Sequence, residues 1–382
     1  MAKQIYLLLF IIFLSCKENS GSEIENTYSK DKKSCSLKLI DSIRFTIDNT
    51  MSYRFISHQI IKKGSSNYLA VGDLNTNGIS IFSFKDKKII QKIIFKYTGP
   101  NAIDAQTGRS FYYHNKDSIF IFNGYVNMIY LSNDKGIIYD KYNISQNKDI
   151  LGETIVTNRF MPSFYNKVLN ICLYPIISPY RKKEKCTDPI YTDYDIYNKT
   201  NEIGKLTYEY AHQKNRHPIY QFPSRIDDSL RLVFLHPFKS ELKIYDKTTE
   251  TFSTKKFESK YIKEYTPFLD SFDKMKRFDV ECTVNDVLFY SKTLKTFYAI
   301  TKLSIPFINP ATGRENAIRQ KPFLVSVFDK DLNKISEHKF EGSKYLIQNS
   351  FAGPKGLYLC TNNPFNPNFN ENTYSYDIYS CK

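Results

Sequence analysis

The sequence repeats a unit of short apolar runs separated by tight turns. Its clearest copy runs from Asn67 to Phe95, where the runs 68–71, 79–82 and 89–95 are separated by turns rich in Asn, Gly, Asp and Lys. Comparable units follow, and their second strands are expected to begin near Asn67, Ser118, Lys167, Leu230, Thr296 and Gly356. A spacing of about 50 to 65 residues is typical of four-stranded propeller blades with some long loops.

The last unit is one strand short, while the chain begins with one strand too many. Strands are expected at 345–351, 356–360 and 374–379, after which the chain stops, and residues 36–48 alternate apolar and polar ahead of the first unit. An unpaired strand edge exposes backbone donors and acceptors, so we expect these two ends to pair. The sequence therefore predicts an all-β protein, a six-bladed β-propeller closed by its N-terminal strand. A sandwich of two sheets would leave the period unexplained.

In the third unit, strands are predicted at 160–165, 167–174, 194–197 and 203–208. Hydrophobic residues make up 41% of the chain and charged residues 24%, which suffices for one large core. We therefore expect residues 36–382 to form a single domain.

The first residues have the pattern of a processing signal. Lys3 precedes an apolar run at 5–14, which is too short to span a bilayer as a mature helix, and Ser15 and Cys16 follow. Residues 13–16, Phe-Leu-Ser-Cys, resemble a bacterial lipobox with Phe in place of the usual Leu. The resemblance implies a signal peptide at 1–15 and acylation of Cys16 by two or three acyl chains, palmitate among them. These chains would anchor the protein firmly in a membrane. An ordinary secretory signal is the alternative.

The residues after that cysteine bear on location. Lys17, Glu18 and Asn19 resemble the export tag that sends Bacteroidetes-type lipoproteins to the outer face of the outer membrane. Residues 18–33 are polar and rich in turn formers, so 16–35 is interpreted as the acylated cysteine with a flexible tether. We expect a lipid-anchored protein of the outer membrane that faces the cell exterior.

Six cysteines remain besides Cys16, and none forms a C-x-x-C pair, so we expect no zinc site. Pairing of the first and last strands would bring Cys35 near Cys381. A disulfide and two unpaired thiols are both compatible with this placement. Cys172 and Cys186 are a second candidate pair.

The blade repeat, the lipobox and the turn at 97–101, Tyr-Thr-Gly-Pro-Asn, together resemble a family of Bacteroidetes lipoproteins that carry a six-bladed propeller domain of unknown function. The resemblance covers Cys35 to Lys382. It implies a fold and a location, and it brings no activity.

Loop lengths indicate where a site would lie. Loops that join second to third strands, or one blade to the next, are long at 175–193, 212–220, 259–279, 304–322 and 362–373, and all of them emerge on one face of a propeller. Binding residues usually lie on loops carried by a rigid scaffold, so this face is the predicted site.

Arginines recur just ahead of the innermost strands. Arg54, Arg109 and Arg159 fit this pattern closely, while Arg225 and Arg277 fit it loosely. We expect them to form a cationic ring at the mouth of the channel that holds a carboxylate, sulfate or phosphate by forked hydrogen bonds. The alternative is structural, with each arginine tying down loop carbonyls or pairing with an aspartate. For sugar stacking, the candidates on long loops are Tyr180, Tyr191, Tyr220, Tyr261, Tyr265 and Phe365.

The formal charge of +15 attracts polyanions, but the lysines are scattered through turns and no nucleic-acid motif is found. We expect a monomeric binding module for an anionic small molecule, a glycan or a protein segment, with no nucleic acid, metal or cofactor. The alternatives are an exported hydrolase or lyase and a scaffold subunit of an outer-membrane complex. Catalytic motifs are absent, although Asp270, Asp273, Asp279 and Glu281 could supply an acid pair.

Overall fold

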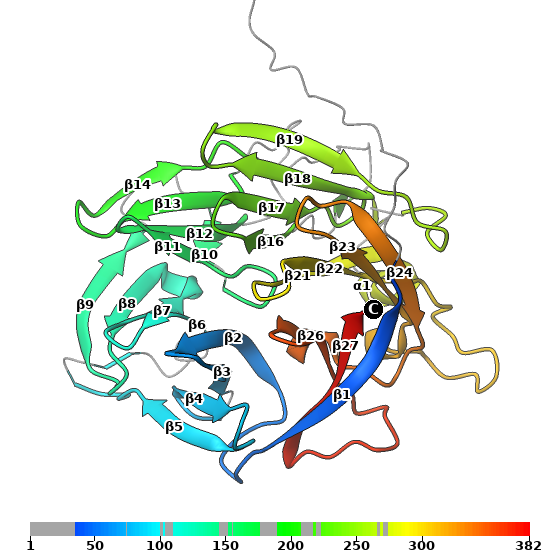
Figure 1. Ribbon diagram of the computed structural model, residues 1–382, viewed down its shortest axis with the longest axis horizontal. Helices are drawn as coiled ribbons and strands as arrows, with labels where there is room; N and C mark the ends of the chain where they lie inside the picture. Colours follow the sequence, from blue (N-terminus) through cyan, green and yellow to red (C-terminus); the bar gives the residue numbers. More distant parts are fainter. Residues whose placement is uncertain are drawn as a thin grey trace, which may run out of the picture.

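The computed structural model describes residues 35–73, 75–99, 102–103, 110–144, 152–154, 156–175, 189–207, 217–218, 223–265, 268–269 and 274–382. Within them, six antiparallel sheets stand around a ring, each with its strands stacked outward from the centre (Figure 1). The predicted six-bladed β-propeller is confirmed.

The strands follow one another outward in every blade. Blade 1 comprises β2 (Phe55–Lys63), β3 (Ser66–Asp73), β4 (Gly78–Ser83) and β5 (Ile89–Ile94). Blade 2 comprises β6 (Phe111–Asn115), β7 (Ser118–Asn123), β8 (Met128–Ser132) and β9 (Ile138–Asn143). In blade 3, two short strands pair with different parts of the next one, and its strands are β10 (Gly152–Thr154), β11 (Ser163–Tyr165), β12 (Val168–Pro175), β13 (Tyr191–Asp195) and β14 (Thr200–Ile203).

The other half of the ring continues this order. Blade 4 comprises β16 (Ser224–Asp227), β17 (Arg231–Leu235), β18 (Glu241–Asp246) and β19 (Thr251–Lys256). Blade 5 comprises β21 (Val284–Ser291), β22 (Thr296–Lys302), β23 (Phe323–Phe328) and β24 (Lys334–Phe340). Blade 6 comprises β25 (Phe351–Gly353), β26 (Gly356–Cys360), β27 (Thr373–Cys381) and, from the start of the chain, β1 (Leu37–Thr46).

Short elements occupy the connections. They are the 3-10 turns η1 (Gly124–Val126), η4 (Ile318–Gln320) and η5 (Ile347–Asn349), the helix α1 (Met275–Glu281), and a ribbon of β15 (His217–Pro218) with β20 (Phe268–Leu269). The helix lies in a segment predicted to be loop. Among helices in the described ranges, none combines the length and the apolar character that a membrane span needs.

Strand β1 closes the ring as predicted. It pairs antiparallel with β27, with Ile43 opposite Tyr376 and Phe45 opposite Tyr374. The rings of Phe45, Tyr374 and Tyr376 are fully buried between blades 6 and 1, because they face the apolar residues of blade 1, such as Leu69, Val71 and Phe82. Just before β1, Cys35 forms a disulfide with Cys381, their Cα atoms 5.5 Å apart. Cys172 is an unpaired, buried thiol, and Cys186, its suggested partner, lies outside the described residues.

The irregular strands differ from the prediction for local reasons. The third strand of blade 3 ends at Asp195, because the carboxylate of Asp195 accepts the N–H groups of Tyr197 and Asn198 and turns the chain. In blade 6, the predicted strand at 345–351 is replaced by η5, after which Ser350 donates its hydroxyl to the carbonyl of Leu346 and only then does β25 begin. Residues 156–161, where blade 3 was expected to begin its first strand, run between β10 and β11.

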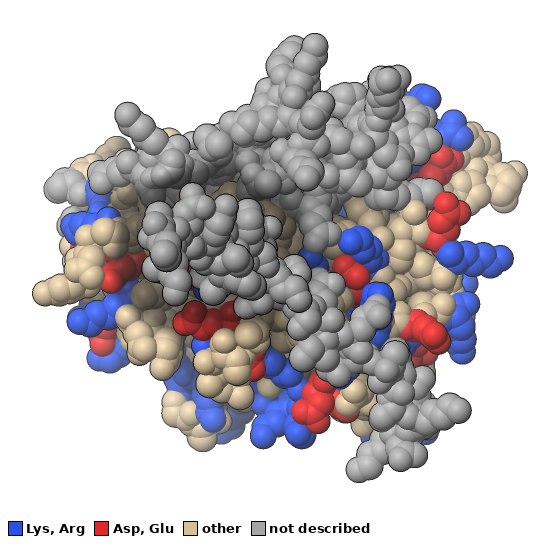
Figure 2. All heavy atoms as spheres, turned by 90° about the horizontal axis from the view of Figure 1, so that it is seen from above, with Lys and Arg blue, Asp and Glu red and all other residues tan. Residues whose placement is uncertain are grey.

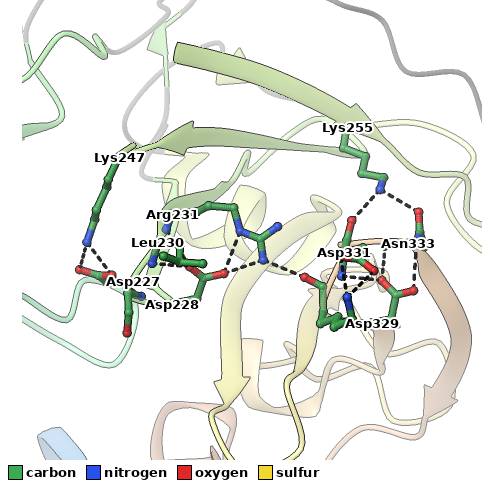
Figure 3. Close-up of polar contacts among 11 residues, drawn as sticks. Asp227, Asp228, Leu230, Arg231, Lys247, Lys255, Asp329, Asp331 and Asn333 are labelled. Carbon is green, nitrogen blue, oxygen red and sulfur yellow. Dashed lines mark hydrogen bonds and ion pairs between the residues drawn. The ribbon is translucent and has the colours of Figure 1, made fainter. Parts of the chain in front are cut away.

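The two faces of the ring have different roles. On the short-turn face, side chains lock neighbouring blades together: Arg231 donates to the carbonyl of Lys330 (2.8 Å), and Lys255 to that of Asp331 (2.7 Å), so β17 and β19 of blade 4 hold the β23–β24 turn of blade 5 (Figure 3). Among the residues drawn in colour in Figure 2, which views the ring edge-on, lysine and arginine are interspersed with aspartate and glutamate. The longer loops between strands and between blades emerge on the opposite face.

Candidate functional site

A pocket of about 340 Å³ opens on the long-loop face between blades 5 and 6. Its walls come from the end of β22, the segment 317–323 around η4, the segment 345–348 around η5 and the β26–β27 loop. Three cationic side chains line it, those of Lys302, Arg319 and Lys321. They come from the end of a strand and from the long loop before β23, so the loop insertion itself builds the pocket.

Lys321 is held by backbone acceptors. Its ammonium donates to the carbonyl of Asp279 at 2.8 Å and to that of Cys282 at 2.5 Å, and the residue is 3% exposed. Burial lowers the pKa of Lys321 to about 8, because a charged amine loses its hydration inside the protein. Lys321 therefore loses its proton just above neutral pH.

A buried carboxylate stands between two of the basic side chains. Asp286 is the extra residue of a β-bulge in β21, which turns its side chain out of the ladder. It forms ion pairs with Arg159 of blade 3 and with Lys302, whose Nζ is 2.7 Å from Oδ2, and only 3% of its side chain is exposed. Burial lowers the pKa of Lys302 to about 7, and the positive charge of Arg159 acts in the same direction. Burial also lowers the pKa of Arg159 to about 10.

The segment that carries Arg159 reaches three other blades. The amide of Asn158 donates to the carbonyl of Gln348 in η5 at 2.6 Å, while the N–H of Arg225 donates to the carbonyl of Arg159 at 2.8 Å. Residues 156–161 of blade 3 thus contact blade 4 through Arg225, blade 5 through Asp286 and blade 6 through η5. This segment therefore joins four blades at the long-loop end of the ring.

Two arginines near the pocket, Arg54 and Arg319, have no acidic partner among the described residues. The guanidinium groups of Arg54 and Arg319 form no ion pair with any acidic residue in the part of the chain that is described, and the buried Nε of Arg54 has no hydrogen-bond partner there. Burial lowers the pKa of Arg319, and the positive charge of Arg54 lowers it further. Asn349 links the two segments by donating to the carbonyl of Tyr53 at 3.0 Å. Two mutually repelling cations favour an anion between or beside them.

The five arginines of the predicted ring lie in different environments and do not form one ring. Arg54 is near enough to Arg319 to lower its pKa, and Arg159 pairs with Asp286, but neither is among the residues that line the pocket. Arg225 is fully buried and donates to Asn170 and to the carbonyl of Met161 (2.6 Å), so it ties blade 4 to blade 3. Arg277 lies exposed on α1 with its Nε 2.8 Å from Oε2 of Glu281. Arg109 and the lipidation residue Cys16 lie outside the described residues.

Among the described residues, no acid pair of the expected kind is found. Glu281 accepts from Arg277 and from the N–H of Phe307, while burial raises the pKa of Asp279. Asp270 and Asp273 lie outside the described residues. Within those ranges, no group of three or more His, Cys, Asp or Glu side chains is placed to hold a metal ion.

Sequence reasoning missed Lys302, Arg319 and Lys321. The rule that found Arg54 and Arg159 looked only at residues ahead of innermost strands, whereas these three flank the long loop between the second and third strands of blade 5. The available signal was the basic pair in Ile318-Arg319-Gln320-Lys321, which ends that loop directly before the strand.

Fold and site together define a six-bladed β-propeller with a basic pocket on its long-loop face. The chain belongs to the family described as domain of unknown function DUF4221, whose model matches residues 34–339. No curated protein matches the chain.

Two solved structures share this fold. A DUF4221 family member from Bacteroides vulgatus is 18% identical and has a TM-score of 0.76, over 92% of this chain and 99% of that one. A protein from Bacteroides fragilis named "Putative exported protein" is 11% identical and has a TM-score of 0.50, over 94% of this chain and 98% of that one. At these identities the likeness shows the fold alone.

Proposed function

We propose that this protein is a binding module whose basic pocket between blades 5 and 6 takes up an anionic ligand. The observation that carries the proposal is the pair of guanidinium groups, Arg54 and Arg319, that lack an acidic partner among the described residues and stand beside two further cations. Charge-assisted hydrogen bonds to a planar guanidinium fork suit a carboxylate, sulfate or phosphate. Their strength increases in a partly buried site, where the effective dielectric constant is lower than in water.

The composition of the pocket favours binding over hydrolysis. A hydrolase or lyase needs an acid and a base that converge on the substrate. The side chains that line the described pocket include three cations and no carboxylate or imidazole. Asp286, the carboxylate that faces Lys302, is occupied by Arg159 and Lys302.

Replacing Arg319 by Gln is expected to weaken anion binding by about 10-fold or more, because one charge-assisted hydrogen bond contributes about 1.5 to 3 kcal/mol. Isothermal titration calorimetry of the full-length chain with sulfate, phosphate and acetate measures this effect. The matched control is Arg277→Gln, which removes the same charge from the exposed face of α1. Equal affinities in the two variants would refute the proposed pocket.

Anion affinity is expected to fall as pH rises from 6 to 9. The pKa of Lys302 is lowered to about 7 and that of Lys321 to about 8, so both amines lose positive charge across this interval, whereas Arg319 keeps its own. Titrations with sulfate at constant ionic strength measure the slope. Lys302→Met should flatten its lower part, and an affinity independent of pH would contradict the role of the two lysines.

We also propose that the protein is exported and anchored through an acylated Cys16 in the outer membrane, facing outward. The signal-like residues 1–15 support this, as does the Cys35–Cys381 disulfide, which is typical of oxidising compartments. The name of the similar Bacteroides fragilis protein agrees with export. Cys16→Ser is expected to abolish palmitate labelling and to release the protein from the membrane fraction. Retention of both in the variant would exclude this anchor.

A further inference from the structure

We propose that the ligand is an organic carboxylate with an apolar body, so that the pocket binds a molecule charged at one end only. This inference rests on the proposed function, because it names the class of anion taken by the same pocket.

The pocket is lined partly by cationic and partly by apolar side chains. Beside the three cations, most of the lining is apolar, and it includes two large side chains that remain exposed: Ile318 at 40% and Phe365 at 45%. An exposed branched chain and an exposed aromatic ring at the rim of one pocket are available to cover an apolar ligand surface, which favours binding by removing both from water. Ile318 directly precedes Arg319 in η4, so an apolar and a charged contact come from the same turn.

The cations are unequally available to a ligand. Lys302 already faces Asp286, and Lys321 donates to two backbone carbonyls, whereas Arg319 has no acidic partner among the described residues. One free guanidinium presents a planar fork, which matches the two oxygens of a carboxylate. A sulfate or phosphate ion carries oxygens on every side and would turn several of them toward Ile318 and Phe365, where no donor meets them.

The volume limits the size of the ligand. About 340 Å³ lies near the lower end of the range for small-molecule pockets, so it suits one compact molecule or the terminal residue of a peptide. Both sources share the same chemistry, a carboxylate next to an apolar group.

Calorimetry of the full-length chain with 3-phenylpropionate, acetate, sulfate and 3-phenylpropanol tests the inference. We expect 3-phenylpropionate to bind at least about 10-fold more tightly than acetate or sulfate, because burial of the ring adds to the charged contact. The neutral alcohol should bind at least about 10-fold more weakly than 3-phenylpropionate. Phe365→Ala should remove most of the advantage of 3-phenylpropionate over acetate. Tyr165→Ala, which trims an aromatic ring that is 72% exposed on the opposite face, is the control and should change nothing.

The outcomes separate this inference from the proposed function. Sulfate binding as tightly as 3-phenylpropionate would overturn the carboxylate class and leave the anion pocket standing. Equal binding of the alcohol and the acid, or no binding by any of the anions, would overturn both. A short peptide that ends in phenylalanine, with a free or an amidated carboxyl group, identifies the source. Tighter binding of the free-acid peptide than of 3-phenylpropionate supports a peptide end, and weaker binding supports a small molecule.

Discussion

Replacing both Cys35 and Cys381 by serine is expected to lower the free energy of unfolding by about 4 to 6 kcal/mol. The bond joins residues separated by 346 positions, so in the unfolded chain it closes a loop that spans nearly the whole domain. In the chain-entropy model the stabilisation grows with the logarithm of loop length, which makes this an unusually favourable place for a cross-link. Urea denaturation, followed by circular dichroism, measures the change.

The same experiment carries its own controls. Dithiothreitol should destabilise the wild-type chain by a similar amount and leave the double serine variant unaffected, because the three other described thiols are unpaired. A double variant as stable as the wild type would mean that the β1–β27 pairing closes the ring without help. This strand pairing itself stabilises the closed ring, since Phe45, Tyr374 and Tyr376 are fully buried along it.

The ring was predictable because its determinants are local and repeated. Alternating apolar residues mark each strand, turn formers mark each short connection, and the surplus strand before blade 1 matches the missing strand of blade 6. Where the prediction was wrong, a side chain redirected the backbone: Asp195 ended β13 early, and the Ser350 hydroxyl supported a 3-10 turn in place of a strand.

The site was predictable only in part because it depends on contacts between blades. The position before innermost strands selected Arg54 and Arg159, and neither of them lines the pocket. Arg225 is enclosed and Arg159 pairs with Asp286 because of the way residues 156–161 pass between blades. No spacing in the sequence predicts this path. The bulge that directs Asp286 inward is likewise invisible in the hydrophobic pattern.

Asp286→Asn is expected to lower the free energy of unfolding by about 3 to 5 kcal/mol, because removing one partner of a buried ion pair leaves the other charges uncompensated. The carboxylate is 3% exposed and faces both Arg159 and Lys302, so the variant keeps the shape of the side chain and leaves two cations against each other. Urea denaturation at pH 7 measures the loss. The control is Asp41→Asn, which removes an exposed ion pair with Lys355 and should cost about 1 kcal/mol or less.

The same substitution should move binding in the opposite direction. Removing the carboxylate lowers the pKa of Lys302 further, because the opposite charge beside it is lost, but it also removes one negative charge from beside the pocket. At pH 6, where more of Lys302 stays protonated, Asp286→Asn is therefore expected to bind acetate more tightly than the wild type does. Adding Lys302→Met to the variant should recover part of the stability and cancel the gain in affinity. If Asp286 served only to hold blades 3 and 5 together, its loss would weaken stability and binding alike. A loss of stability together with a gain in acetate affinity would therefore show that Asp286 lowers the positive charge that the pocket presents to an anion.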